Sequence, residues 1–131
     1  MNDIFKQVEN NIDKLVEKQV VWSSCATAED LQKAKNGNLE LKLGISKPVP
    51  KSWIKDIQGK NVLCLAGAGG LQAPLLACAG ANVTVVDISE KMLEKDRKVA
   101  QREKLNIECV HGNMCDLTMF KDGTFDYIIN P

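Results

Sequence analysis

The sequence predicts an α/β fold, namely a Rossmann-like doubly wound parallel sheet truncated after the fourth strand, with an N-terminal helical cap. Three observations predict it. After Gly59 the pattern runs strand, helix, strand, helix, strand, strand, with short connections. The strands expected at 61–65 and 83–87 are continuous apolar runs, which indicates burial on both faces of a parallel sheet. A turn of small residues, 66–70, joins the first strand to its helix, so a ligand can approach the backbone there.

Residues 1–58 predict a helical segment that caps the sheet. Apolar residues recur at helical spacing and predict an amphipathic helix over residues 3–19. We expect its stripe to be buried against the domain or, alternatively, against a neighbouring chain: Ile4, Val8, Ile12, Leu15 and Val16. Thr27 is the expected N-cap of a second helix, over 28–35.

Two weaker patterns complete this segment. Leu39, Leu41 and Leu43 alternate with polar residues, which is typical of a strand. Apolar residues within 53–57 indicate one helical turn that closes at Gly59.

Residues 59–131 supply the rest of the sheet. We expect helices over 71–79 and from Ser89, as N-cap, to about residue 104, and strands at 107–110 and 127–129. Right-handed crossover connections then predict the strand order three, two, one, four, which leaves the fourth strand at an edge.

Composition excludes several classes of function. The 131 residues carry 17 Lys and Arg against 17 Asp and Glu, so the formal net charge is zero. Nucleic-acid binding depends on an excess of basic residues, so no nucleic-acid partner is expected. No apolar run approaches the ~18 residues of a membrane span, so no membrane partner is expected either.

The cysteines predict reduced thiols rather than a metal site. There are five cysteines, none at CxxC spacing, and a single histidine, His111. This set disfavours zinc, so we expect no metal. An odd number of cysteines, several within apolar runs, indicates structural thiols and a cytoplasmic location.

The small-residue turn and an acid together indicate a nucleoside site. Residues 66–70 open onto the N-terminus of a helix, which favours anionic or electron-rich groups. Asp87 ends the second strand, where a carboxylate can accept hydrogen bonds from ribose hydroxyls. The dinucleotide pattern GxGxxG begins at Gly67 and Gly69, but its third position is Gln72, which disfavours a nicotinamide or flavin cofactor.

Four motifs in order resemble the class I S-adenosylmethionine-dependent methyltransferases, in particular the type 11 methyltransferase domain. They are V-L-C-L-A-G-A-G-G at 62–70, D-I-S-E-K-M-L at 87–93, G-N-M-C-D-L at 112–117 and F-D-Y-I at 125–128. The first motif departs from the family pattern, since its acid is replaced by Cys64 and two of its glycines by alanine. In the family that acid helps to orient the glycine loop and the cofactor amine.

The resemblance implies a site for S-adenosyl-L-methionine, or for S-adenosylhomocysteine as product. The residues that it assigns to cofactor binding are Ala66, Gly67, Ala68, Gly70, Asp87, Ile88, Met92, Asn113, Met114 and Asn130. The turn would follow the methionine part of the cofactor, and Asn130 would lie near its amino group and the methyl donor.

The same resemblance assigns the nucleoside half. Asp87 would hold the ribose hydroxyls, and Ile88 and Met92 would contact the adenine. Asn113 would hydrogen-bond the adenine edge, with the Met114 backbone beside it. Met92 at helical spacing is also consistent with a plain core residue.

The chemistry implied is an in-line transfer of a methyl group, for which the protein mainly aligns the acceptor and excludes water. We therefore name no catalytic residue and give His111 a structural role. The family sheet has seven strands and four are visible, so we expect residues 59–131 to be the cofactor-binding half, with the C-terminal half absent and this chain inactive alone. A small-molecule acceptor is favoured, with self-association through the fourth-strand edge or the N-terminal helix.

Two other functions stay open at this point. One is a nucleotide-binding Rossmann module of an oxidoreductase or epimerase, which the missing third glycine of GxGxxG disfavours. The other is a degenerate, non-catalytic binding module, which Cys64 in the acid position favours slightly.

Overall fold

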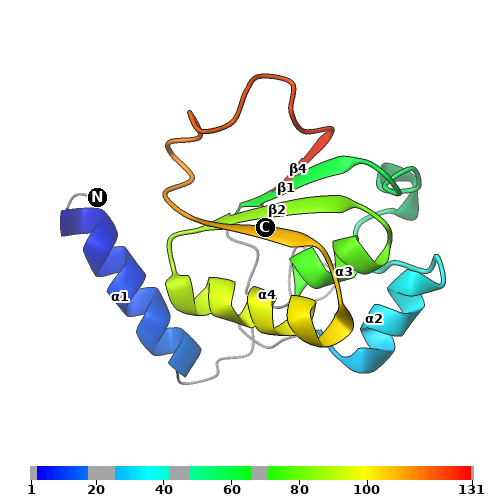
Figure 1. Ribbon diagram of the computed structural model, residues 1–131, viewed down its shortest axis with the longest axis horizontal. Helices are drawn as coiled ribbons and strands as arrows, with labels where there is room; N and C mark the ends of the chain where they lie inside the picture. The colour runs from blue at the N-terminus through cyan, green and yellow to red at the C-terminus, as the bar shows by residue number, and fades with distance from the viewer. Residues whose placement is uncertain (1–2, 18–25, 42–47, 66–70, 131) are drawn as a thin grey trace.

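The structure, a computed structural model, describes residues 3–17, 26–41, 48–65 and 71–130, with 15–17 described by their backbone alone. Helices and strands alternate along the second half of the chain, as expected (Figure 1). The elements are α1 (Asp3–Glu17), α2 (Ala28–Lys35), the 3-10 turn η2 (Lys51–Trp53), β1 (Asn61–Leu65), α3 (Gln72–Cys78), β2 (Asn82–Asp87), α4 (Glu90–Glu103), β3 (Ile107–His111) and β4 (Tyr127–Ile129).

The four strands form one parallel sheet in the order β3-β2-β1-β4, which confirms the predicted order. Cys64 of β1 lies level with Val85 of β2 on one side and with Ile129 of β4 on the other. Because parallel strands all point the same way, their carboxyl ends meet at one edge of the sheet. We call this edge the carboxyl edge. The predicted site residues that the structure describes lie at strand ends on this edge or in the segments that directly follow them.

Each face of the sheet has its own apolar core, because successive side chains of a strand point to opposite faces. Val62 and Cys64 belong to the larger core, which α2, α3 and α4 share. Leu63 and Leu65 belong to a smaller core, which the connection from β3 to β4 covers. Phe120 and Phe125 of this connection pack on that core and contact each other edge to face. In Figure 1 the helices α2, α3 and α4 lie below the sheet and this connection arches above it, which accounts for strands buried on both sides.

Two local features fix how the chain enters and leaves the helices beside β2. Gly80 ends α3 with φ +95°, and a Cβ there would lie 2.8 Å from the Gln58 side chain, so no larger residue fits without movement. Ser89 caps α4, since its side-chain oxygen accepts a hydrogen bond from the Met92 backbone N–H at 3.2 Å. The cap predicted at Ser89 is therefore confirmed, as is the cap at Thr27.

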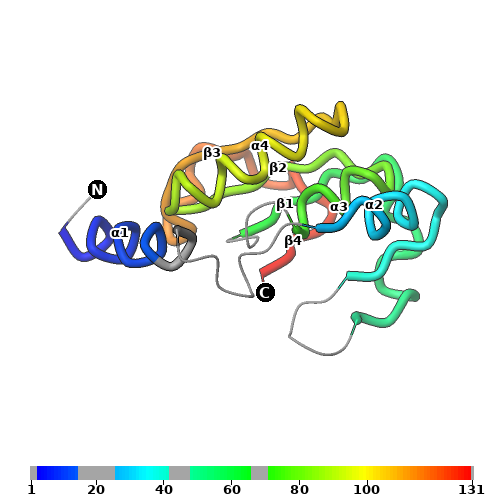
Figure 2. Tube along the Cα trace, turned by 90° about the horizontal axis from the view of Figure 1, so that it is seen from below, coloured from blue at the N-terminus to red at the C-terminus, as the bar shows by residue number. Residues whose placement is uncertain are grey.

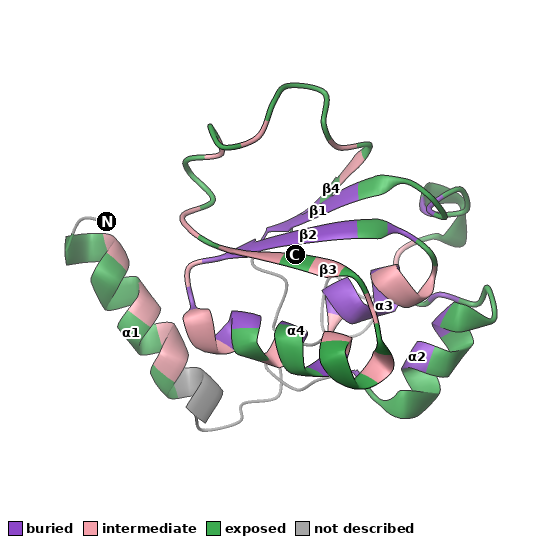
Figure 3. Ribbon diagram, viewed as in Figure 1, coloured by how far each residue is buried: buried purple, intermediate pink, exposed green. Residues whose placement is uncertain are grey.

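The predicted burial of the α1 stripe against the domain is wrong for two of its members. Ile4 is 68% exposed and Val8 is 41% exposed, while Ile12 is half-buried. The side chains of Leu15 and Val16 lie outside the described residues. The reason is that α1 turns a polar edge towards the rest of the domain, as the next subsection describes, and it stands at the end of the molecule (Figures 2 and 3).

The strand predicted from the leucine alternation is also not found over its described part. Leu39 and Leu41 are both buried, but no strand includes them. The Leu41 carbonyl accepts a hydrogen bond from the Val49 N–H at 2.7 Å, which satisfies the backbone locally. The alternating pattern therefore indicates that Leu39 and Leu41 are buried in the larger core, not that they pair in a sheet. Leu43 lies outside the described residues.

Candidate functional site

The carboxyl edge brings together the ends of β1, β2, β3 and β4. Asp87 ends β2 and pairs in register with His111 of β3, and Asn130 directly follows β4. The predicted loop residues Ala66, Gly67, Ala68 and Gly70 lie outside the described residues, so their part in the site stays a prediction. The other six predicted residues all follow a strand end at this edge or, like Asp87 and Met92, lie at the junction of β2 and α4.

Asp87 is a buried carboxylate, with only 6% of its surface exposed. Its Oδ1 accepts a hydrogen bond from the Ser89 N–H at 2.9 Å. Burial raises the pKa of Asp87 above its ordinary value, and the Asp13 carboxylate raises it further. Hydrogen bonds from the Ser89 and Ile88 amides and the nearby His111 oppose this rise in pKa. The fold therefore holds the Asp87 carboxylate, a hydrogen-bond acceptor, in a buried position where desolvation disfavours its ionised form.

The start of α4 follows Asp87 without a loop. Ile88 is half-buried, and its carbonyl lies 2.9 Å from His111 Nε2. Met92 is buried in the first turn of α4, and its N–H donates to the side chain of the Ser89 cap. Both apolar side chains therefore belong to the β2–α4 junction beside Asp87, on which an apolar ring could rest.

The turn after β3 places the next predicted pair. The Gly112 N–H donates to the Asp87 carbonyl at 3.0 Å, so this turn is tied directly to the acid. Asn113 is half-buried, and its Oδ1 accepts from the Cys115 N–H at 2.9 Å. Met114 is exposed beside it. The internal hydrogen bond uses the carbonyl oxygen of the Asn113 side chain and fixes the side-chain orientation.

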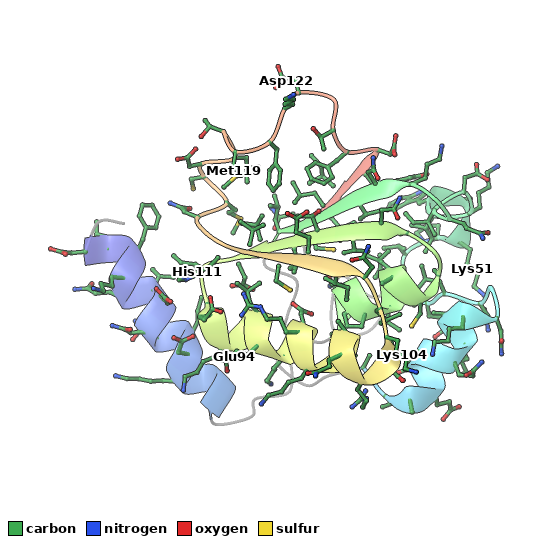
Figure 4. The ribbon with its side chains drawn as sticks, in the orientation of Figure 1. Lys51, Glu94, Lys104, His111, Met119 and Asp122 are labelled. Carbon is green, nitrogen blue, oxygen red and sulfur yellow. The ribbon has the colours of Figure 1, made fainter. Side chains whose placement is uncertain are left out.

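Helix α1 contributes two carboxylates that the sequence analysis missed. Glu9 Oε1 lies 2.9 Å from His111 Nε2, and Asp13 Oδ1 accepts a hydrogen bond from Ser89 Oγ. The second ring nitrogen of His111 lies 3.5 Å from Glu90 Oε2. The side chain of His111, at the end of β3, thus links the sheet to Glu9 of α1 (Figure 4). The one sequence signal for this contact is the i, i+4 spacing of Glu9 and Asp13, which places both on one face of a helix but does not name the partner.

Four carboxylates therefore gather around the carboxyl edge, from Glu9, Asp13, Asp87 and Glu90. Glu90 is paired with Arg97 and Glu9 contacts His111, so the negative charge that favours ligands with hydroxyl donors or positive charge comes mainly from Asp13 and Asp87. Among the described residues, no group of three or more His, Cys, Asp and Glu side chains is arranged to hold a metal ion. The arrangement is therefore suited to holding an uncharged or cationic organic group.

The raised pKa of Asp87 predicts a pH-dependent effect on stability. The native state holds the proton at pH values where the unfolded chain has released it, so the free energy of unfolding falls as pH rises above 3.8 through the native pKa. Asp87→Asn mimics the neutral form, and we expect it to raise the melting temperature at pH 7. Well below pH 3.8 both proteins are neutral at this position, so the difference in melting temperature should vanish. Equal melting temperatures at pH 7 would contradict the prediction.

The contact between α1 and α4 predicts how firmly α1 is docked. Asp13→Ala removes a hydrogen bond to a charged acceptor, worth about 1.5 kcal/mol or more. We expect amide hydrogen exchange in α1 to accelerate by about tenfold, since α1 then opens more often. Asn11→Ala, at an exposed position of the same helix, is the matched control and should leave exchange unchanged. The same exchange rate in both variants would show that Asp13 does not hold α1.

Comparison with known proteins relates this arrangement to a family. The family model described as a methyltransferase domain matches residues 63–131. The uncharacterized methyltransferase YbaJ of Bacillus subtilis (strain 168) is 44% identical over 131 residues, which is all of this chain and 51% of that protein. Demethylmenaquinone methyltransferase of Clavibacter sepedonicus is 35% identical over 75 residues, 57% of this chain and 30% of its own length. The chain thus spans about half the length of the first of these relatives and less of the second.

Solved structures share the fold. The PH0226 protein from Pyrococcus horikoshii OT3 aligns with a TM-score of 0.50 at 39% identity, over 59% of this chain and 36% of that one. A structure described as "Conversion of a Disulfide Bond into a Thioacetal Group during Echinomycin Biosynthesis" aligns with a TM-score of 0.54 at 22% identity, over 79% of this chain and 47% of that one. With the family model covering more than half of the residues, the chain belongs to the methyltransferase domain family.

Proposed function

We propose that the protein is an S-adenosylmethionine-dependent methyltransferase and that these 131 residues form its cofactor-binding portion. The observation that carries the proposal is the buried Asp87 carboxylate at the carboxyl edge, within the segment that matches the methyltransferase domain. A carboxylate held in this position is suited to the paired hydroxyls of a ribose. Membership of the family supplies the remaining support.

The described residues fit an adenosine-containing cofactor. Asp87 offers a carboxylate anchored by the Ser89 amide, and Ile88 and Met92 supply apolar surface beside it. The negative charge of this edge also suits a cofactor that carries an ammonium and a sulfonium group. When bound, S-adenosylmethionine supplies an electrophilic methyl group.

We propose roles for the remaining predicted residues in the same frame. Asn113 and the Met114 backbone would meet the adenine edge, since the Gly112 amide ties their turn to Asp87. Asn130, exposed after β4 on the same edge, would lie towards the methionine end, with the loop Ala66, Gly67, Ala68 and Gly70. The protein's contribution is to orient the cofactor and exclude water, and we assign no side chain a proton transfer.

The acceptor is proposed to be a small organic molecule. Relatives of this chain are named as a demethylmenaquinone methyltransferase and a ubiquinone biosynthesis O-methyltransferase, both of which are named for small molecules. We propose a division into a helical cap segment, 1–58, and a cofactor-binding part, 59–131.

Self-association and location are further parts of the proposal. β4 stands at the edge of the described sheet, where Ile128 is 62% exposed, and Ile4 of α1 is exposed as well. Exposed apolar residues on an edge strand favour pairing with another chain. Cys64, Cys78, Cys109 and Cys115 are free thiols, which is typical of a reducing compartment and supports a cytoplasmic location. No described helix has both the length and the apolar character needed to cross a membrane.

Cofactor binding tests the proposal directly. Calorimetry on the full-length protein should show binding of S-adenosylhomocysteine and none of NAD. Asp87→Ala should weaken that binding by about 2–5 kcal/mol, because one or two hydrogen bonds to a charged acceptor are lost. Asp122→Ala, in an exposed turn far from the edge in Figure 4, is the control and should bind as the parent does. NAD binding without S-adenosylhomocysteine binding would refute the proposed cofactor.

A further inference from the structure

A second buried carboxylate lies inside the domain, away from the ribose-binding position. The inward stripe of α4 consists of Met92, Leu93, Asp96 and Val99. Asp96 is 1% exposed, although its neighbours in the stripe are apolar. A carboxylate buried in this way costs several kcal/mol of desolvation that an apolar side chain at the same helix position would avoid. Apolar packing alone therefore does not account for a carboxylate at this position.

The register of the sheet shows what lies beneath this stripe. Cys64 of β1, Val85 of β2 and Cys109 of β3 form one row across the sheet, on the face that α4 covers. Figure 1 shows α4 along this side of the sheet, beside α3. Burial raises the pKa of Cys64 to about 12 and that of Cys109 to about 11, and in each case the Asp96 charge raises the pKa further. Asp96, buried on α4, therefore acts on the thiols of both outer strands of this row.

This row lies directly below the candidate site. Asp87 is two residues beyond Val85 along β2, a distance of about 6.6 Å. Cys64 is the next-to-last residue of β1, just before the connection to α3. Position 64 is also where the first motif of the resembled family carries an acid, and the thiol found there stays neutral because its pKa is so high. Strand β1 thus lacks a carboxylate, while α4, which packs on the same face of the sheet as Cys64, holds the buried Asp96.

We infer that Asp96 supplies from α4 the carboxylate that is absent at position 64, and that it is a positioning residue for the cofactor. The inference rests on the proposed function. Asp96 does not reach the ligand; it acts on the end of β1, from which the small-residue connection starts, and so holds the carboxyl edge in its binding arrangement. Negative charge in a buried place of low dielectric acts over a greater distance than the same charge at the surface. Asp87 remains the group that meets the ribose.

Relocating the carboxylate tests this inference. Asp96→Asn and Asp96→Ala should each weaken S-adenosylhomocysteine binding to the full-length protein by about tenfold to a hundredfold. The double variant Cys64→Asp, Asp96→Ala removes the carboxylate from α4 and places one on β1 instead. It should recover most of the affinity for S-adenosylhomocysteine. Glu94→Gln, on the exposed side of α4 (Figure 4), is the matched control and should bind as the parent does.

The outcomes separate positioning from a merely structural role. A structural role would change the free energy of unfolding in urea but would give no recovery of affinity in the double variant. An Asp96→Asn protein that binds with parental affinity, or a folded double variant that does not bind, overturns the inference. Where Asp96→Asn fails to fold, the double variant alone decides it. A parent protein that binds no S-adenosylhomocysteine refutes the proposed function and the inference with it.

Discussion

Parallel pairing of four strands is the constraint on which the rest of the structure depends. Since β1, β2, β3 and β4 all run the same way, every connection that leaves a carboxyl end begins at one edge. That geometry brings Asp87, the turn after His111 and the residue after β4 together although they are far apart in the sequence. The amides that follow β2 then hold the Asp87 carboxylate, because the cap of α4 begins only two residues later. Site and sheet are therefore one arrangement, and a change of register would move the acid away from the edge.

Much of the fold could be predicted because it depends on local sequence patterns. The strands at 61–65 and 127–129, the α4 cap at Ser89 and the order of the strands follow from apolar runs, capping residues and crossover handedness. What the sequence did not predict depends on contacts between distant segments. An apolar stripe shows that a helix has a face, but α1 instead meets the domain through Glu9 and Asp13, whose partners His111 and Ser89 lie far along the chain. The strand predicted from Leu39 and Leu41 is wrong for a related reason, because side chains can alternate between buried and exposed without any neighbouring strand.

Two buried carboxylates, Asp87 and Asp96, lie on either side of the cap of α4. Burial raises the pKa of Asp87, and Asp96 is 1% exposed on the inward stripe of α4. Asp96 could have been noticed in the sequence, because it interrupts the spacing of Leu93 and Val99 with a charge. Its relation to Cys64 could not, because only the register of β1, β2 and β3 shows that the α4 stripe covers that row. Burial of the carboxylate and a position close to the cap of α4 together distinguish Asp87 and Asp96 from the exposed acidic residues.

Ser89 links the two ends of this system. Its hydroxyl accepts from the Met92 amide to begin α4 and donates to Asp13 of α1, while its own amide donates to Asp87. A ligand that engages Asp87 therefore acts on a group whose neighbours hold α1 in place, and the Asp13 charge acts back on the pKa of Asp87. Coupling of this kind is reciprocal: if ligand binding steadies α1, then docking of α1 strengthens ligand binding by the same factor. The polar edge of α1 that carries Glu9 and Asp13 faces the domain, and Ile4 and Val8 are left exposed on another side of the helix.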